Sequence, residues 1–139
     1  MEKKEIIDIA TKYMQIWNAD KNGLLSDFAS ADLEVEYTHF EKTYHGIEDY
    51  RQALDKTYMS FPDIKIVIDE VHASENKAFI KWTYTGSHLN GTLFGIEPTG
   101  KKVKVSGFTI LDILDGKVVR EYGIVDNLAL VLQIGALKM

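Results

Sequence analysis

Apolar residues in the first half of the chain recur every three or four positions, the spacing that places them on one face of a helix. This pattern predicts an amphipathic helix from Ile6 to Trp17, a short helix around Leu24 to Phe28 and a third helix from Ile47 to Ser60. Between the second and third helices, apolar and polar side chains alternate from Leu33 to His39, which indicates a half-buried strand. The first half of the chain is therefore expected to be mainly helical.

The second half of the chain has the alternation and the turn residues of strands joined by hairpins. Asp115 and Gly116 form the strongest hairpin signal, because this dipeptide favours the tight turn between two antiparallel strands. Helices followed by antiparallel strands predict one α+β domain over residues 1–139, in preference to an alternating α/β fold. The predicted strands cover Ile64–Val71, Ile80–Tyr84, Val103–Leu114 and Lys117–Val125, and a short apolar helix follows over Leu128–Ile134.

The composition of the chain excludes several classes of function. Its 139 residues carry 16 Lys and Arg against 21 Asp and Glu, a net charge of −5, so we expect no basic surface for nucleic acid. The absence of cysteine removes disulfides, thiolate metal sites and cysteine nucleophiles, and it is compatible with the cytoplasmic location that we expect. No apolar stretch approaches the ~20 residues of a membrane span, and no signal peptide is expected at the charged N-terminus.

One nucleotide-binding motif is only partly matched. The segment from Gly95 to Lys102 fits the phosphate-loop pattern G-x-x-x-x-G-K up to its last position, where Lys102 replaces the Ser or Thr that holds magnesium. Pro98 interrupts the loop, and a strand pattern follows in place of the helix that would cradle phosphate. We therefore interpret this segment as a turn between strands. The four histidines also lack the spacing of a metal site.

Three polar residues share strand faces with aromatic neighbours, and they are the candidate catalytic residues: His39, His88 and Asp126. A carboxylate in an aromatic pocket has its pKa raised by desolvation, which suits a general base near neutral pH. A histidine opposite it donates a hydrogen bond to an enolate or carries the proton. The alternative for Asp126 is the N-cap of the last helix, a role compatible with lining a pocket, and the alternative for either histidine is a hydrogen-bonded core residue.

The aromatic residues divide between the core and a predicted cavity. The chain holds two Trp, seven Tyr and six Phe, and we assign those on the predicted helices to helix packing. The strand from Val103 to Leu114 has apolar residues on both faces, which predicts cover by the helices on one side and by a second subunit on part of the other. The expected wall of the cavity, where substrate would bind, consists of Tyr37, Trp82, Tyr84, Phe108 and Tyr122.

Several segments of the second half resemble, in order and spacing, the SnoaL-like polyketide cyclases, also described as predicted ester cyclases. The family pattern consists of four motifs in order: G-T-H, G-x-P-P-T-G, D-G-K-I, and a final D followed by Q-L-G. This chain resembles them in the same order. The matching segments are Trp82 to His88, Leu93 to Lys101, Asp115 to Val118, Asp126, and Gln133 to Gly135.

The resemblance implies a cone-shaped fold of the nuclear transport factor two kind. In this fold, a curved and mostly antiparallel sheet is wrapped by three N-terminal helices, with a short C-terminal helix. The resemblance also implies a deep apolar pocket for a small hydrophobic molecule and a homodimer packed through the outer face of the sheet. Its chemistry is aldol ring closure, in which an aspartate removes a proton alpha to a carbonyl with no metal or cofactor.

This chain departs from the family at the residues that carry the chemistry. The family's aspartate matches Gly123, and the supporting Gln and His match Gly107 and Thr109. Glu97 and Tyr122 also replace the commoner Pro and Trp. Because glycine has no group to accept a proton, an enzyme of this sequence must use another base.

Two functions from different classes follow from these observations. The first is an enzyme that moves a proton on a hydrophobic carbonyl compound, as a cyclase, isomerase or dehydratase does, with Asp126, His39 or His88 as its base. The second is a protein that binds a small apolar ligand without turnover. A dimeric scaffold whose interior is filled by its own side chains is a third possibility, and a cavity of ligand size would count against it.

Overall fold

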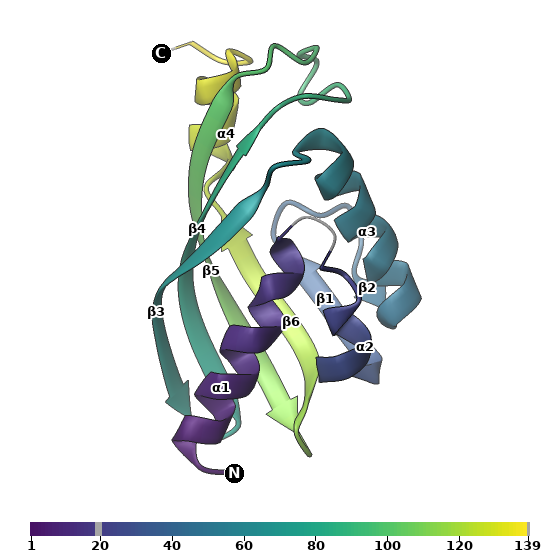
Figure 1. The fold of residues 1–139 in the computed structure, drawn as a ribbon, viewed down its shortest axis with the longest axis vertical. Helices are drawn as coiled ribbons and strands as arrows, with labels where there is room; N and C mark the ends of the chain where they lie inside the picture. The colour runs from purple at the N-terminus through teal and green to yellow at the C-terminus, as the bar shows by residue number, and fades with distance from the viewer. Residues whose placement is uncertain (19–20, 139) are drawn as a thin grey trace.

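Six strands form one curled, open sheet in the computed structural model, which describes residues 1–18 and 21–138 (Figure 1). The strands lie side by side in the order β2-β1-β6-β5-β4-β3. Every neighbouring pair is antiparallel except β1 and β6, which are parallel. Their bounds are β1 Ala29–Tyr37, β2 Tyr44–His45, β3 Lys65–Ser74, β4 Lys77–Ser87, β5 Lys102–Leu114 and β6 Lys117–Val125.

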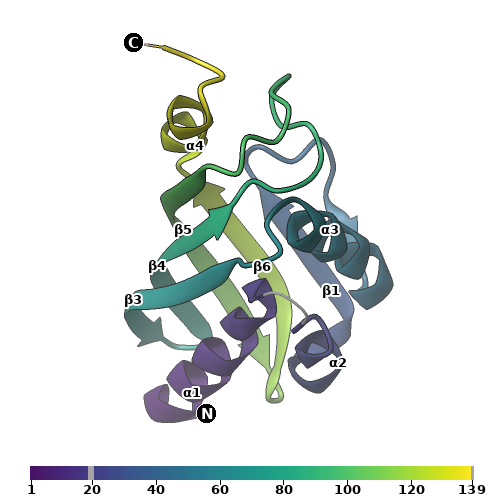
Figure 2. The same ribbon diagram turned by 45° about the horizontal axis from the view of Figure 1, so that its top comes forward.

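The helices lie where the apolar periodicity predicts them. Helix α1, Lys3–Tyr13, continues into a 3₁₀ turn, Met14–Trp17, and α2 spans Leu24–Phe28. Helix α3 covers Ile47–Ser60 and α4 covers Asn127–Ile134. Figures 1 and 2 show α1 and α3 on the concave side of the sheet, with α4 at the end where β6 terminates. The predicted α+β fold, with three N-terminal helices and a short C-terminal helix, is confirmed.

Two features of the sheet differ from what the sequence predicts. The pair Tyr44–His45 forms the short edge strand β2, for which the sequence pattern gives no prediction. The parallel pairing of β1 with β6 joins distant parts of the chain, with Tyr37 beside Gly123 in the register. A turn dipeptide such as Asp115-Gly116 predicts only the pairing of two consecutive strands, so it cannot predict the pairing of β1 with β6.

A bulge in β6 reverses the direction of its side chains. Asp112 of β5 pairs with Arg120 and Ile113 pairs with Val118, which leaves Val119 as an extra residue. Beyond this residue, the alternation continues with the opposite phase. As a result, Glu121 points into the cone and is fully buried, while Tyr122 faces outward.

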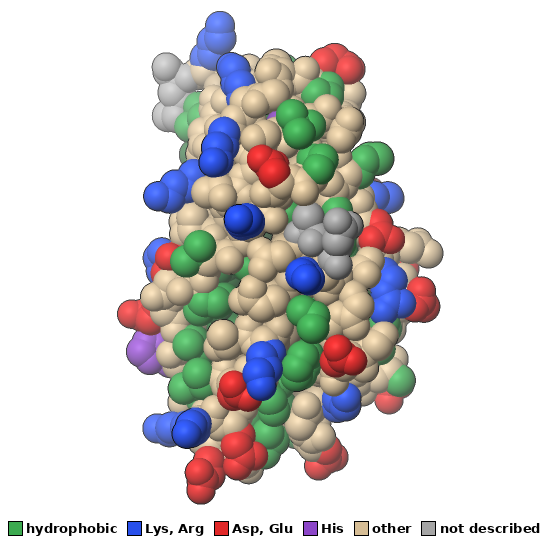
Figure 3. All heavy atoms as spheres, viewed as in Figure 1, with side chains coloured by type: hydrophobic (Ala, Val, Ile, Leu, Met, Phe, Trp, Pro, Cys, Tyr) green, Lys and Arg blue, Asp and Glu red, His purple; other side chains and the backbone are tan. Residues whose placement is uncertain are grey.

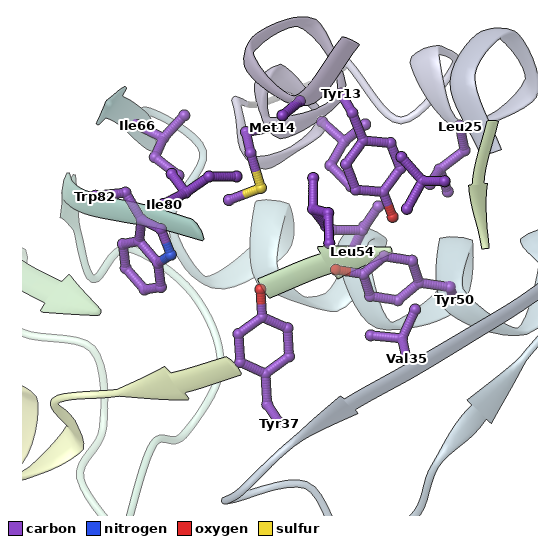
Figure 4. Packing of buried hydrophobic residues seen from close by; sticks show 14 of the residues in the cluster. Tyr13, Met14, Leu25, Val35, Tyr37, Tyr50, Leu54, Ile66, Ile80 and Trp82 are labelled. Atoms are coloured by element: carbon purple, nitrogen blue, oxygen red, sulfur yellow. The ribbon is translucent and has the colours of Figure 1, made fainter. Parts of the chain in front are cut away.

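The core lies between the concave face of the sheet and the helices. Figure 4 shows its buried aromatic and aliphatic side chains, with the hydroxyl groups of Tyr13, Tyr37 and Tyr50 pointing toward one another. These three tyrosines come from α1, β1 and α3, and each is at most 1% exposed. Buried hydroxyl groups need hydrogen-bond partners, so their convergence indicates a polar group at the centre of the apolar core.

The outside of the molecule carries charges of both signs. On the face shown in Figure 3, Lys and Arg side chains are interspersed with Asp and Glu, without a continuous basic patch. Among the described residues, no helix has the length and apolar character needed to cross a membrane. The cytoplasmic location stays a prediction from the sequence.

Candidate functional site

A cavity of about 280 Å³ lies in the cone, at the end where β1 and β6 terminate. Its lining is mainly apolar, and its aromatic rings come from the turn after α1, from β1 and β4, and from the residues after α3. Its volume and lining are those of a small-molecule site, because such sites are concave, mostly apolar and hold a few polar groups. The rings that enclose its deeper part belong to Trp17, Tyr37, Phe61, Trp82 and Tyr84.

Two of these rings lie across glycines on the neighbouring strand. Tyr37 is the register partner of Gly123, and Trp82 is the register partner of Gly107. A Cβ on Gly123 would be 2.7 Å from the Phe108 carbonyl oxygen and closer still to the Tyr37 ring. A Cβ on Gly107 would likewise overlap the Trp82 ring. Both positions therefore accept only glycine while these rings keep their places.

The polar atoms of these rings bond to the interior of the protein. The indole N–H of Trp82 donates to Thr109 Oγ1 at 2.9 Å, and Thr109 Oγ1 lies 2.8 Å from the Tyr37 hydroxyl. The Tyr37 hydroxyl donates to Glu121 Oε2, so it accepts the proton of Thr109. This directional chain leads from the wall of the cavity to the centre of the core. The rings of Trp17, Tyr37 and Trp82, which form the floor of the cavity, therefore present surfaces whose polar atoms are already paired.

Glu121 is the acceptor for the aromatic residues around it. Oε1 accepts the Tyr13 hydroxyl at 2.7 Å. Oε2 accepts the Tyr50 hydroxyl at 2.9 Å and the Trp17 indole N–H at 3.3 Å, in addition to Tyr37. Desolvation raises the pKa of Glu121, and the donated hydrogen bonds oppose the rise. Burial, followed by the charge of Glu121, raises the pKa of Tyr13, Tyr37 and Tyr50 well above the ordinary value, so all three stay protonated as donors.

Glu121 is the important residue that the sequence reasoning missed. In the sequence Arg120-Glu121-Tyr122, alternation counted from Val118 places Glu121 in solvent, and the bulge at Val119 reverses this result. One signal points to it nevertheless. Tyr13, Tyr37 and Tyr50 all fall on predicted inward faces, and so many buried hydroxyl groups require a shared acceptor.

The mouth of the cavity carries its titratable groups. His39, Lys56 and Phe94 are the exposed members of the lining, whereas Tyr37 and Trp82 are buried. The His39 ring lies 6.2 Å from the Tyr37 ring and 4.8 Å from the Phe40 ring, between centroids. Desolvation lowers the pKa of His39, so its imidazole is neutral at neutral pH and can accept a proton.

Tyr84 brings a further polar group to the lining. Burial raises the pKa of Tyr84 above its ordinary value, so its hydroxyl stays protonated. No hydrogen bond joins this hydroxyl to another of the described residues, which leaves it able to donate to a ligand. Tyr37, Trp82 and Tyr84, three of the predicted substrate-binding residues, all line this one cavity.

The other two candidate catalytic residues lie outside the lining. His88 is fully buried in the loop after β4, where Nε2 lies 2.5 Å from the Gly91 carbonyl oxygen. Its Nδ1 has no partner among the described residues. Asp126 is exposed and accepts the backbone N–H of Ala129 at 3.1 Å, which makes it the N-cap of α4, the alternative that the sequence offers. Any catalytic role for His88 or Asp126 stays a prediction.

Phe108 and Tyr122 lie on the outer face of the sheet, away from the cavity. Phe108 is 59% exposed, and Tyr122 contacts Arg120, whose guanidinium carbon is 5.4 Å from the ring centroid. The expectation that both rings belong to the cavity wall is therefore corrected. For Tyr122 the physical reason is the bulge at Val119, which turns it outward. Phe108 follows Gly107, and Gly107 occupies the inward position.

Comparison with solved structures places the fold in a known class. TsrD from Streptomyces laurentii superposes with a TM-score of 0.84 at 22% identity, covering 99% of each chain. AclR from Streptomyces galilaeus gives 0.86 at 20% identity, covering 99% of this chain and 85% of the other. A protein from Catenulispora acidiphila with a ketosteroid isomerase-like fold superposes with a TM-score of 0.76 at 16% identity. The match covers 91% of this chain and 92% of the other. No curated protein matches the chain.

The curled sheet and its apolar cavity therefore define a ketosteroid isomerase-like α+β cone. The model of the SnoaL-like polyketide cyclases matches residues 7–134, and the chain belongs to this family. At the family level this supports a small-molecule enzyme. The sequence resemblance assigns the family's aspartate and glutamine to Gly123 and Gly107, and in this structure the rings of Tyr37 and Trp82 lie over these two glycines.

Proposed function

We propose that the protein is an enzyme that moves a proton on a hydrophobic carbonyl compound held in the aromatic cavity, as a cyclase, isomerase or dehydratase does. The observation that carries the proposal is the placement of His39. Its imidazole lines an apolar cavity of ligand size, and partial burial lowers its pKa so that the neutral, basic form prevails near neutral pH. Of the three candidate catalytic residues named from the sequence, only His39 lines the cavity.

The proposed reaction begins with an apolar substrate stacked against Trp82 and Tyr84. A ring nitrogen of His39 takes the proton alpha to the carbonyl, and the electrons of the C–H bond form an enolate. The Tyr84 hydroxyl, which has no partner among the described residues, donates a hydrogen bond to the enolate oxygen. The imidazolium of His39 then returns the proton to the substrate, so the enzyme ends each cycle unchanged.

Asp126 and His88 have supporting roles in this proposal. Asp126 caps α4, the helix that contributes Asn127 and Leu130 to the lining. His88 holds the loop after β4 through Gly91, and that loop supplies Phe94 to the mouth of the cavity. Their replacement should change the shape of the cavity and leave the base in place.

The second candidate, a protein that binds an apolar ligand without turnover, is favoured by a specific observation. The polar atoms of Trp17, Tyr37 and Trp82 are all occupied by Glu121 or Thr109, so these three rings offer no free group for chemistry. Residue 123, to which the sequence resemblance assigns the family's aspartate, is also a glycine. A simple binding site needs only shape and apolar surface.

Exchange of alpha protons with solvent distinguishes the two candidates. In D₂O, the protein should accelerate deuterium incorporation into 2-tetralone, a compact hydrophobic ketone, as followed by proton NMR. The variant His39→Gln should remove the acceleration, whereas Asp126→Asn should retain it. If wild type and His39→Gln exchange the ketone equally, His39 is not the base and the binding function is favoured.

The assembly that we propose is a homodimer packed through the outer face of the sheet. Phe108 and Ile124 are cross-strand neighbours on this face, exposed by 59% and 52%. Phe79, Ile110 and Tyr122 follow in the adjacent row. An exposed apolar patch across three strands is typical of a protein interface, which supports this proposal.

A further inference from the structure

The charges that line the cavity differ in sign from the charge of the whole protein. The chain has a net charge of −5. Among the described residues that line the cavity there is no Asp or Glu, whereas Lys56 and His39 are both present. A ligand that enters the cavity therefore meets a positive group at the mouth and no fixed negative charge on the wall.

Lys56 is available to a ligand. It lies on α3, it is exposed at the mouth, and it forms no ion pair with another of the described residues. Some other lysines do form ion pairs, as Lys42 does with Asp49 and Lys81 does with Asp69. An unpaired ammonium group beside an apolar cavity is an attachment point for an anion.

Two acidic residues next to lining residues are already engaged. Asp126, next to the lining residue Asn127, accepts the backbone N–H of Ala129. Asp63, next to the lining residue Ile64, accepts the backbone N–H and the hydroxyl of Ser87 at 2.7 and 2.8 Å. Neither carboxylate contacts Lys56, so neither neutralises it.

We propose that the ligand of this cavity is an amphiphilic carboxylate, with its apolar body against the aromatic floor and its carboxylate at Lys56. The N–H of Trp82 and the hydroxyl of Tyr37 cannot hold the charged end, because they are occupied by Thr109 and Glu121, and the Tyr84 hydroxyl carries no charge to balance a carboxylate. The carboxylate stays at the mouth, where Lys56 and water solvate it. This inference rests on the proposed function, since it names the substrate class of the same site, but binding tests it without turnover.

Intrinsic fluorescence provides the measurement. The chain contains two tryptophans, Trp17 and Trp82, and both line the cavity, so their emission reports its occupancy. The probes are 4-phenylbutyrate and the neutral 4-phenylbutanamide, which have the same apolar body. We expect the carboxylate to bind about threefold to fivefold more tightly than the amide at low salt, as for an exposed ion pair, with the difference shrinking as salt is added.

Two variants test the role of Lys56. Lys56→Gln should abolish the preference for 4-phenylbutyrate and leave the affinity for 4-phenylbutanamide unchanged. Lys4→Gln changes the net charge equally on a distant helix, where the lysine is exposed and unpaired among the described residues, and it should keep the preference.

Three results would overturn the inference: no binding of either probe, equal binding of both by the wild type, or a preference that survives Lys56→Gln. The proposed function fails separately, if His39→Gln leaves the exchange of 2-tetralone unchanged. A preference for the carboxylate together with unchanged exchange would support a binding protein for amphiphilic acids.

Discussion

The Tyr37 ring lies over Gly123, its register partner on β6, and occupies the space that a side chain at position 123 would need. The same relationship joins Trp82 to Gly107 across β4 and β5. Both glycines match positions at which the family resemblance places catalytic side chains. At both positions the cavity therefore has ring surface in the space that a side chain would need.

Gly123→Ala should destabilise the protein by about 2 kcal/mol or more, because the new methyl group overlaps the Tyr37 ring and the Phe108 carbonyl oxygen. Urea denaturation followed by circular dichroism measures the loss. Gly23→Ala is the matched control, since a Cβ there meets nothing within 4 Å and the φ of Gly23 is −60°. The control should be neutral or slightly stabilising.

Removing the ring should recover part of this loss. In Tyr37→Ala, the Gly123→Ala change should cost clearly less than in the wild type, which gives a favourable coupling energy in a double-mutant cycle. Recovery should be incomplete, because the Phe108 carbonyl oxygen still lies 2.7 Å from the added Cβ position. Strictly additive losses would contradict the steric relationship.

Glu121→Leu should destabilise the protein by about 3 kcal/mol or more, because it leaves the hydroxyl groups of Tyr13, Tyr37 and Tyr50 without their acceptor. Glu121→Gln should cost much less. Its carbonyl oxygen can replace Oε2, and its amide group can donate to Tyr13, whose hydroxyl accepts as well as donates. Equal losses in the two variants would show that the hydrogen bonds at this position matter little.

The pH dependence of stability should report the same carboxyl group. Burial raises the pKa of Glu121 above its ordinary value of 4.5. Between the unfolded and folded pKa, the folded state keeps a proton that the unfolded state has released, so stability falls as pH rises through the folded pKa. Thermal melts from about pH 4 to 8 should show this fall in the wild type and a flatter profile in Glu121→Gln. Parallel profiles would contradict the assignment.

The exchange of 2-tetralone should rise with pH and level off, since His39 must be neutral to accept a proton. Burial lowers the pKa of His39 from its ordinary value of 6.5, so the midpoint should lie below that pH. His72→Gln is the control, because His72 is exposed and pairs with Glu70 at 3.2 Å, outside the cavity. A midpoint above pH 6.5, or its retention in His39→Gln, would assign the titration to another group.

The proposed homodimer predicts that Phe108→Glu produces a monomer, because a buried charge in the apolar patch has no partner. Sedimentation velocity over a range of protein concentrations measures the assembly. Met59→Glu is the control: Met59 is 54% exposed on α3, away from the outer face of the sheet, and its variant should remain dimeric. A wild type that sediments as a monomer throughout would contradict the dimer.

Local patterns predict most of the elements because each depends on near neighbours in the chain. Apolar spacing predicts the span of α3, Ile47–Ser60, and the Asp115-Gly116 turn predicts where β5 ends and β6 begins. Asp126 precedes the apolar helix α4, and its role as N-cap is confirmed. The predicted cavity residues Tyr37, Trp82 and Tyr84 line the cavity, because their strands alternate without interruption up to those positions.

The remaining part of the site depends on relationships that local patterns do not contain. The extra residue Val119 reverses the face on which every later side chain of β6 lies. Alternation alone therefore assigns Tyr122 to the inner face and Glu121 to solvent, which is the opposite of the structure. The donors to Glu121 come from α1, the 3₁₀ turn after it, β1 and α3, and it takes the tertiary fold, including the parallel pairing of β1 with β6, to bring them together. Lys56 lies at the mouth for the same reason: the fold, and not its neighbours in sequence, gives it that place.

The parallel contact between β1 and β6 also sets the order in which the protein can mature on the ribosome. Tyr13, Tyr37 and Tyr50 emerge early, whereas their acceptor, Glu121, lies near the end of the 139-residue chain. Strands β3, β4 and β5 can pair successively as hairpins form, but β1 has no inner neighbour until β6 is made. Until β6 has been made, the tyrosine hydroxyl groups of the N-terminal half lack this acceptor and remain hydrogen-bonded to water. The core can close only after that step.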